Sequence, residues 1–412
     1  LVIGSAGSLG SGSYAGQVTL SASTTFTYSS SASQTLSGKI TGSGALTKDT
    51  SSSSTLTLSG STSDYTGPTT VSSGIVKVTT SAALGGSGSG EGTTVASGGA
   101  VHVEGSGLSL AEPFTISGTG SSSTGALLNL ANANTITGAV TLGADATVGS
   151  TLGTFTFNVS SGNSFTASSG TPALTFTGAG DLSVADPIST PIAGVTKSGA
   201  GTLTLSAANT HTGVTSISAG VLVAGDSAAL GSQSTGTTIS SGARLELSHS
   251  TGLTIAESID VAGTGGGSGA IRSALGANTI TGAVTLTAAS TITSVGSASL
   301  DFNVTSGDAF TGSFGLTFDG TGNTTVSDSI ATGSGTLTKS GTGTLDLIAA
   351  NTYTGSSSLT AGTTIVRTAT GLGTTASGTT VSADATLAIS SATALTIGER
   401  SEEHTSELQS QF

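Results

Sequence analysis

Acidic side chains, with two arginines among them, are the residues of this chain whose type and spacing could support catalysis. Carboxylates gathered around a calcium ion beside an arginine could cleave an acidic polysaccharide. The candidates for this chemistry lie in one stretch of the chain. They are Asp301, Asp308, Asp319, Asp328, Glu246, Glu257, Asp260, Arg244 and Arg272.

An internal copy of the same stretch argues against a catalytic cluster. The four later aspartates correspond to Thr156, Asn163, Thr177 and Asp186 in that copy, so only Asp328 keeps a carboxylate partner. We therefore interpret the acids as scattered solvated charges. We predict no catalytic, cofactor-binding or metal-binding residue and no enzymatic activity.

Histidines and short motifs add no further chemistry. His102 is expected to face outward in a strand, His211 to occupy a turn, and His249 to follow a strand. No second ligand stands at metal-binding spacing from any of them. Despite 64 glycines, the sequence has no GxGxxG, GxxxxGK[ST], GxSxG or HExxH motif, which removes support for nucleotide, phosphate and hydrolase sites.

Composition limits the partners. The 412 residues have a net charge of −13, and 8% of them are charged, so the surface repels nucleic acid and anionic lipid. No apolar stretch is long enough for a membrane span. Without cysteine there is no disulfide and no thiolate metal site.

The elements that must position all these residues are repeats. The segment Asn134 to Leu142 returns unchanged at Asn278 to Leu286, and the segment that begins at Thr196 returns from Thr338. A third, worn copy begins at Ala45. We predict one repeat region over residues 1–399, with units of about 145 residues at 45–196, 197–338 and 339–399, the last one cut short.

Within a unit, short runs such as Thr202-Leu-Thr-Leu205 alternate apolar and polar residues and are separated by glycine turns. This pattern predicts an all-β chain, and repetition without cysteine favours a right-handed parallel β-helix of about 16–20 coils. Six matched phenylalanines are expected to form aromatic ladders inside it. They are Phe157, Phe165 and Phe176, and Phe302, Phe310 and Phe318.

The stretch from Thr196 resembles the autotransporter-associated β-strand repeat. That family's pattern is a Lys-Ser/Thr-Gly-x-Gly-Thr-Leu-x-Leu opening, an Asn-Thr-Tyr-Thr-Gly turn and an Ala-Gly-x-Leu strand. The corresponding segments here are Lys197 to Leu205, Asn209 to Gly213, Ala219 to Leu222, Lys339 to Leu347, Asn351 to Gly355 and, in degenerate form, Lys48 to Gly67. His211 departs from the pattern, because Tyr353 and Tyr65 stand at that place in the other copies.

The resemblance implies an exported bacterial β-helical passenger, secreted or held at the cell surface, and often part of an adhesin. Such proteins are similar in having a leader upstream and a β-barrel downstream, which we expect in segments outside this fragment. A stalk or adhesive passenger is the predicted function, with glycans or surface proteins of a host or the environment as partners. The fragment itself is not expected to insert into a membrane or to bind nucleic acid.

Two alternatives remain open. One is a carbohydrate-active β-helix that binds or cleaves polysaccharide. The other is an ice-binding solenoid, because Thr-x-Thr recurs, for example at Thr202-Leu-Thr204. Any strand with outward threonines and inward aliphatic residues has the sequence Thr-x-Thr, however. The spacings between successive Thr-x-Thr motifs are also uneven, whereas an ice-binding face needs one motif per coil in register.

The last residues differ from the rest of the chain. Arg400, Glu402, Glu403 and Glu407 crowd into the end of a chain that is otherwise poor in charge. Residues 400–410 match the in-frame translation of a common sequencing-library adapter. We therefore interpret residues 400–412 as a non-native tail and assign no function to His404.

Overall fold

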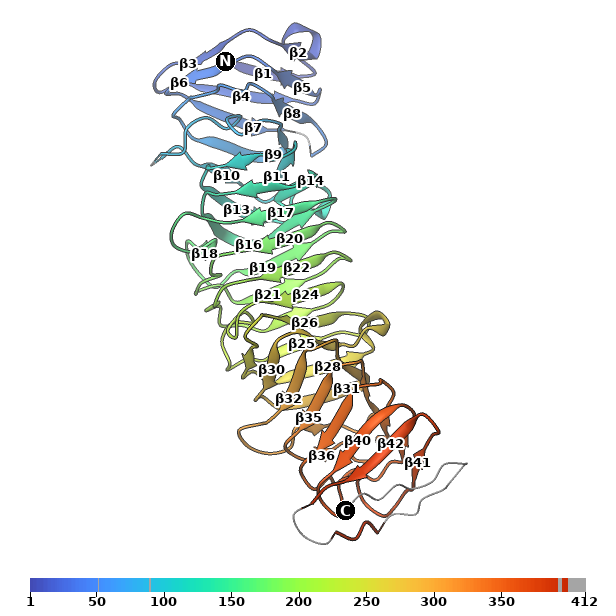
Figure 1. Ribbon diagram of the computed structural model, residues 1–412. Coiled ribbons are helices and arrows are strands. Elements are labelled where there is room, and N and C mark those ends of the chain that lie inside the picture. Colours follow the sequence, from blue (N-terminus) through green and yellow to red (C-terminus); the bar gives the residue numbers. More distant parts are fainter. Residues whose placement is uncertain (51, 89, 392–394, 399–412) are drawn as a thin grey trace. The chain divides into compact units, whose positions relative to one another are not determined.

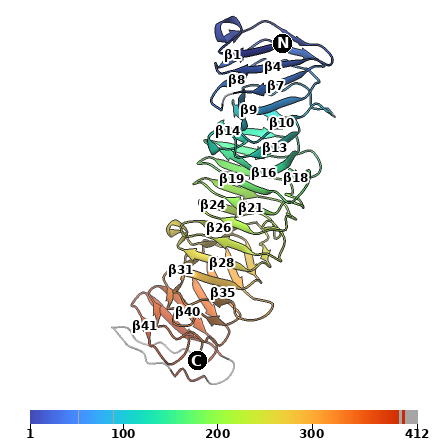
Figure 2. The ribbon, with the colours of Figure 1, turned by 180° about the vertical axis from the view of Figure 1, so that it is seen from behind.

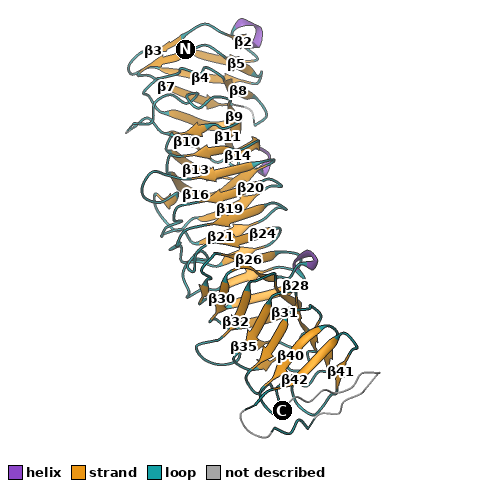
Figure 3. Cartoon of the chain, viewed as in Figure 1, coloured by secondary structure: helices purple, strands orange, loops and turns teal. Residues whose placement is uncertain are grey.

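The computed structural model describes residues 1–50, 52–88, 90–391 and 395–398. Strands dominate this part of the chain (Figure 3), and its helical elements are three short 3₁₀ turns, η1 (Gly10–Gly12), η2 (Ser121–Ser123) and η3 (Gly265–Gly267). The predicted tail, 400–412, lies outside the described residues. The chain divides into two compact units, residues 1–213 and 214–412, and each is described by itself.

The first unit contains the strands β1 to β22. They are β1 (Val2–Ser5), β2 (Ser13–Tyr14), β3 (Val18–Leu20), β4 (Thr25–Ser30), β5 (Gln34–Leu36), β6 (Ile40–Gly42), β7 (Ala45–Asp49), β8 (Thr55–Leu58), β9 (Thr69–Val78), β10 (Thr93–Val95), β11 (Gly99–Glu104), β12 (Ser109–Leu110), β13 (Phe114–Gly118), β14 (Leu127–Ala131), β15 (Asn134–Ile136), β16 (Val140–Ser150), β17 (Thr154–Phe157), β18 (Phe165–Ala167), β19 (Ala173–Thr177), β20 (Asp181–Val184), β21 (Gly194–Lys197) and β22 (Thr202–Leu205).

The second unit contains β23 to β42. They are β23 (Thr215–Ile217), β24 (Val221–Ala224), β25 (Thr237–Ile239), β26 (Arg244–Ser248), β27 (Thr254–Ile255), β28 (Ile259–Gly263), β29 (Ile271–Leu275), β30 (Ala277–Ile280), β31 (Val284–Ser294), β32 (Ser299–Phe302), β33 (Phe310–Thr311), β34 (Leu316–Asp319), β35 (Asn323–Val326), β36 (Ile330–Ala331), β37 (Leu337–Lys339), β38 (Thr344–Leu347), β39 (Ser357–Leu359), β40 (Gly362–Val366), β41 (Thr379–Val381) and β42 (Ala385–Ile389).

Each unit is a parallel β-solenoid. In the first unit, β1, β4, β7, β9, β10, β13, β16 and β18 pair in succession, always parallel, and β12, β15, β17, β20 and β22 form another column. Figure 1 shows these strands stacked one coil on the next, and Figure 2 shows the same stack from behind. The chain therefore returns to the same face once per coil.

The second unit repeats this arrangement. The strands β27, β30, β32, β35, β38, β40 and β42 form one parallel column, and β26, β29, β31, β34, β37, β39 and β41 form another. The described residues make about 18 turns in all. The predicted all-β parallel solenoid and its predicted number of coils are confirmed.

The interior follows from strict alternation along the strands. In β22, Leu203 and Leu205 are fully buried while Thr202 and Thr204 lie half-exposed on the outside. Burying one such side chain stabilises the fold by about 1.5–3 kcal/mol. Because the partner on the next coil has the same pattern, every inward residue packs on inward residues above and below it.

The predicted aromatic ladders are present. The ring centroids of Phe157 and Phe165 are 4.8 Å apart, and those of Phe302 and Phe310 are 4.6 Å apart. Phe176 and Phe318 complete the two clusters with edge-on contacts. All six rings are buried. The predicted unit boundaries at 45–196, 197–338 and 339–399 stay predictions.

Candidate functional site

The four aspartates of the second unit do not converge on one site. Each is bound to a residue in a neighbouring coil. The Ser327 hydroxyl donates to Asp301, Ser329 to Asp308, Ser340 to Asp319, and the Val304 amide to Asp328. Among the described residues, no group of three or more His, Asp or Glu side chains could hold a metal ion. The four aspartates of this stretch therefore accept hydrogen bonds that connect neighbouring coils.

Asp328 and Asp186, the one matched pair of acids, have the same structural role. Asp328 Oδ2 accepts the Val304 amide at 2.7 Å, and Asp186 Oδ2 accepts the Val159 amide at 2.7 Å. Both amides lie just after a strand that ends in phenylalanine, where the backbone leaves the ladder. The carboxylate satisfies an N–H that would otherwise lack a strand partner.

The two arginines bind to one acid rather than facing a ligand. Arg272 Nη1 lies 2.7 Å from Glu246 Oε2, and Arg244 Nε lies 3.5 Å from the same oxygen. These three side chains occupy neighbouring outward positions of β26 and β29. Glu246 thus bridges an arginine of its own strand and an arginine of the next coil.

Glu257 and Asp260 separate in the structure. Asp260 is exposed on β28, as expected of a solvated charge, whereas Glu257 is only 3% exposed. The expectation of a solvated Glu257 is wrong. It lies at a chain corner beside an inward threonine, and strand alternation says nothing about corner residues.

The histidines vary in burial. His102 lies half-buried on β11 beside Lys77, and burial lowers its pKa to about 4. His249 is exposed and contacts the Thr251 hydroxyl at 3.0 Å. His211 is fully buried. In the described ranges none of them belongs to a group of three or more His, Asp or Glu side chains that could hold a metal ion.

Three buried lysines are the feature that sequence reasoning missed. Lys48, Lys197 and Lys339 are at most 3% exposed. Their Nζ atoms bind backbone carbonyls at the next turn. Lys197 Nζ lies 2.9 Å from the Ser198 oxygen, and Lys339 Nζ lies 3.3 Å from the Ala361 oxygen. Burial lowers the pKa of all three lysines, that of Lys197 to about 8.

The sequence did contain a sign that these lysines are buried, because each one is the first residue of a copy of the repeat pattern. An inward position at the end of an alternating strand predicts burial, but a lysine normally favours the surface. The carbonyls at the turn supply the polar partners that make burial possible.

The motif tyrosines also point inward. The Tyr65 hydroxyl lies 2.5 Å from Thr69 Oγ1, and the Tyr353 hydroxyl lies 2.7 Å from Ser357 Oγ. Each tyrosine thus fills the corner of its coil and binds a hydroxyl at the start of the following strand.

Asparagine amides close the same turns. Asn209 Oδ1 accepts the Ile188 amide at 2.8 Å, and Asn351 Oδ1 accepts the Ile330 amide at 2.7 Å. The lysine, tyrosine and asparagine of the family pattern therefore make contacts inside the turns of the solenoid.

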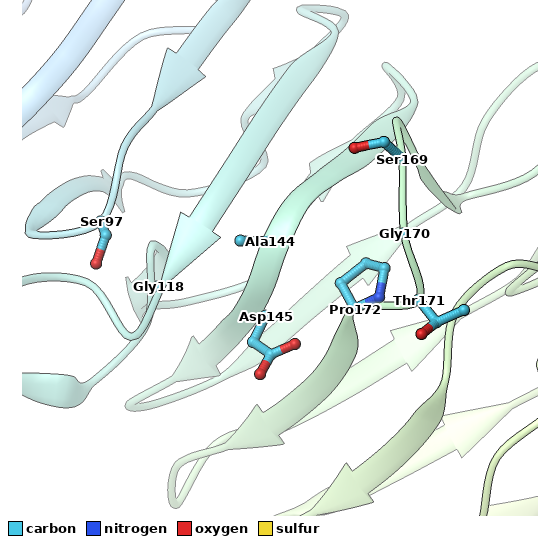
Figure 4. Close-up of a pocket in the computed structure, with 8 residues that line it drawn as sticks. All are labelled: Ser97, Gly118, Ala144, Asp145, Ser169, Gly170, Thr171 and Pro172. Atoms are coloured by element: carbon cyan, nitrogen blue, oxygen red, sulfur yellow. The ribbon is translucent and has the colours of Figure 1, made fainter.

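One shallow hollow lies on the first unit. It has a volume of about 560 Å³, is widely open to solvent, and is lined by Ser97, Gly118, Ala144, Asp145, Ser169, Gly170, Thr171 and Pro172. Figure 4 shows Asp145 between Ser97 on one side and the turn from Gly170 to Pro172 on the other. Asp145 Oδ1 accepts the Ala173 amide at 2.9 Å.

Outward threonines of the first unit align in one column. Seven strands in succession carry a threonine at the same register position. They are Thr27, Thr47, Thr70, Thr94, Thr115, Thr141 and Thr166. Neighbours in the column are about 4.8 Å apart, as in any sheet. The flanking column two residues earlier contains Ala45, Pro68 and Gly92, so the threonines form a single row.

Comparison with known families supports the resemblance. The passenger-associated-transport-repeat family matches residues 51–78, 195–224 and 337–366. Searches of curated proteins and of solved structures found no significant match. The chain carries three passenger-associated-transport repeats, as the sequence patterns predicted. A β-solenoid with these repeats fits the passenger of an autotransporter.

No helix in the described ranges has the length and apolar character that a membrane span needs.

Proposed function

We propose that the chain is a stalk or adhesive segment of an exported bacterial surface protein and acts without catalysis. The observation that carries the proposal is the placement of the repeat motifs. The lysine, tyrosine and asparagine of the family pattern all bind backbone or hydroxyl groups inside the solenoid. The repeats thus build a regular stem and leave the outer faces free to vary.

Binding without turnover tests this proposal. The purified chain is incubated with immobilised glycans and surface proteins, and with soluble polysaccharides of acidic and neutral type. We expect retention on at least one surface and no new reducing ends in solution. Release of oligosaccharides would overturn the non-catalytic assignment and favour the carbohydrate-active alternative.

Glycans are the proposed partner at the hollow around Asp145. One oxygen of this carboxylate binds the Ala173 amide, and Ser97, Ser169 and Thr171 add hydroxyls around it. Hydroxyl and carboxylate groups on an open surface suit the hydroxyls of a sugar chain. Asp145→Ala should weaken glycan retention, while Asp260→Ala, which changes an exposed acid in the second unit, should not.

Ice binding is the third candidate, after the carbohydrate-active alternative, and the aligned threonine column of the first unit is the observation that favours it. Thermal hysteresis of the purified chain measures it directly. Replacing Thr94 by Tyr would interrupt the column at its centre. Ice binding is supported if the unchanged chain shows thermal hysteresis and the Thr94→Tyr variant does not. It is excluded if the unchanged chain shows no hysteresis.

A further inference from the structure

Two glutamates are buried at equivalent corners of the repeat copies. Glu112 follows Leu108-Ser-Leu-Ala in the first unit, and Glu257 follows Leu253-Thr-Ile-Ala in the second. Glu112 is 4% exposed and Glu257 is 3% exposed. Glu112 and Glu257 are called the buried-acid pair below.

Each acid has the same hydroxyl partner. Thr93 Oγ1 donates to Glu112 Oε1 at 2.7 Å, and Thr237 Oγ1 donates to Glu257 Oε2 at 2.8 Å. Both threonines begin a strand and point inward, with 1% of their surface exposed. The hydrogen bond therefore joins the corner of one coil to the strand of the coil before it.

Within the described part of the chain, no ion pair includes either acid. The ion pairs of the described residues join lysines and arginines to other acids. The titratable group that acts on Glu112 is the Glu91 carboxylate, which disfavours its charge, and Glu112 in turn helps to raise the pKa of the buried Tyr65 hydroxyl. Around Glu257, burial and the Thr237 hydroxyl are the influences on its charge.

An unpaired buried carboxylate is costly, so each of these groups holds its proton to a higher pH in the folded chain than in the unfolded chain. Burial raises the pKa of Glu112 to about 8 and that of Glu257 to about 7. Both are well above the ordinary value near 4.5 for glutamate. The backbone next to each acid is tightly packed, because a Cβ on Gly138 or Gly282 would overlap the acid's own carbonyl oxygen.

We propose that the buried-acid pair makes the solenoid pH-sensitive: each protonated carboxyl keeps its coil corner closed, and its ionisation at mildly alkaline pH loosens that coil. The sign follows from linkage. A group whose folded pKa lies above its unfolded pKa contributes its full stability below the unfolded value, and loses it as pH rises through the folded value. The corner at Glu257 should loosen first, near neutrality, and the corner at Glu112 at higher pH.

Limited proteolysis of the whole chain at about pH 6 and about pH 9 tests the proposal, with cut sites mapped by mass spectrometry. The matched variants are Glu112→Gln, Glu257→Gln and the double variant, since Gln keeps the size and accepts the threonine hydrogen bond. Asp260→Asn is the control, because it removes an exposed negative charge three residues from Glu257.

In the unchanged chain and in Asp260→Asn, we expect cleavage near residues 93–116 and 237–261 to become at least about tenfold faster at the higher pH, after correction for the protease's own pH dependence. The double variant should lose this increase, and each single variant should lose it only at its own corner. An equal increase in the double variant, or no increase in the unchanged chain, would overturn the proposal.

Discussion

The Nζ atom of Lys197 lies 2.8 Å from the carbonyl oxygen of Gly199, inside the solenoid and not on its surface. Lys197 is the last residue of β21, and the chain turns directly after it. The ammonium group therefore binds the carbonyls of its own turn. A residue that looks like a surface charge in the repeat pattern is part of the interior.

Lys197→Met tests this contact, because methionine fills a similar volume but cannot donate to carbonyls. We expect the free energy of unfolding to fall by about 1–3 kcal/mol, since buried carbonyls lose their donor. Lys39→Met is the matched control. Lys39 is partly exposed and paired with Asp64, so its loss should cost less than about 1 kcal/mol. Denaturant unfolding measures both, and equal losses would contradict the interior role.

The burial of Lys197 should also make the stability of the folded chain depend on pH. Its pKa is lowered from 10.5 to about 8 by burial, so the folded chain releases this proton before the unfolded chain does. Stability from this group should therefore rise as pH increases from about 8 to about 10.5. The difference in Tm between the unchanged chain and Lys197→Met, followed across that range, measures the effect. A difference that shrinks with rising pH would refute it.

Asp328→Ala should destabilise the second unit. The Val304 amide would lose a charge-assisted acceptor at 2.7 Å, which costs about 1–3 kcal/mol. Asp328→Asn keeps an acceptor oxygen and should lose less. Chemical denaturation of both variants, beside Asp260→Ala as a surface control, gives the order. The structural role fails if Asp328→Ala and Asp260→Ala unfold alike.

Phe302→Ala should weaken the aromatic ladder of the second unit. Phe302 is fully buried and its ring centroid lies 4.6 Å from that of Phe310, so its truncation should cost about 3–5 kcal/mol locally. Phe314→Ala is the control, because the Phe314 side chain is 42% exposed. Resistance to limited proteolysis should drop for Phe302→Ala alone. Unchanged resistance of that variant would contradict the ladder.

Gly201→Ala should distort the stack of coils in the first unit. A Cβ at this position would overlap the carbonyl oxygen of Gly180 in the coil before it, so the backbone must shift. We expect a loss of about 1–3 kcal/mol or more. Gly4→Ala meets nothing within 4 Å and serves as the control. Thermal unfolding of the two variants compares them directly, and similar Tm values would show that the coils can move apart freely.

Much of the fold was predictable because alternation and repetition are local signals. The pattern of Leu203 and Leu205 between Thr202 and Thr204 specifies which face is buried, and copying that pattern specifies a stack of coils. The phenylalanine ladders followed from the repeat shift alone, since equivalent residues of stacked copies occupy equivalent places.

The candidate site was harder to predict. The acids around Asp301 were predicted to be scattered solvated charges. They do not converge on one site, but each of the four aspartates accepts a hydrogen bond from another coil, which the sequence pattern does not show. In a solenoid, chain neighbours at a turn bind the coils beside them, and Ser327, Ser340 and the Val304 amide each take one acid. The hollow at Asp145 is made by residues from four coil turns, and no short motif contains them.

The sequence by itself determined the all-β solenoid, the inward aliphatic and aromatic residues, and the repeat family, because all of these depend on periodicity along the chain. Only the tertiary structure decided where the polar residues at the corners went. Lys197 and Tyr353 are buried because their own turns supply hydrogen-bond partners, the Gly199 carbonyl and the Ser357 hydroxyl. Glu257 is buried because Thr237, one coil earlier, supplies its partner. Burial of a polar group depends on such partners, and a pattern of residue types along one strand does not contain them.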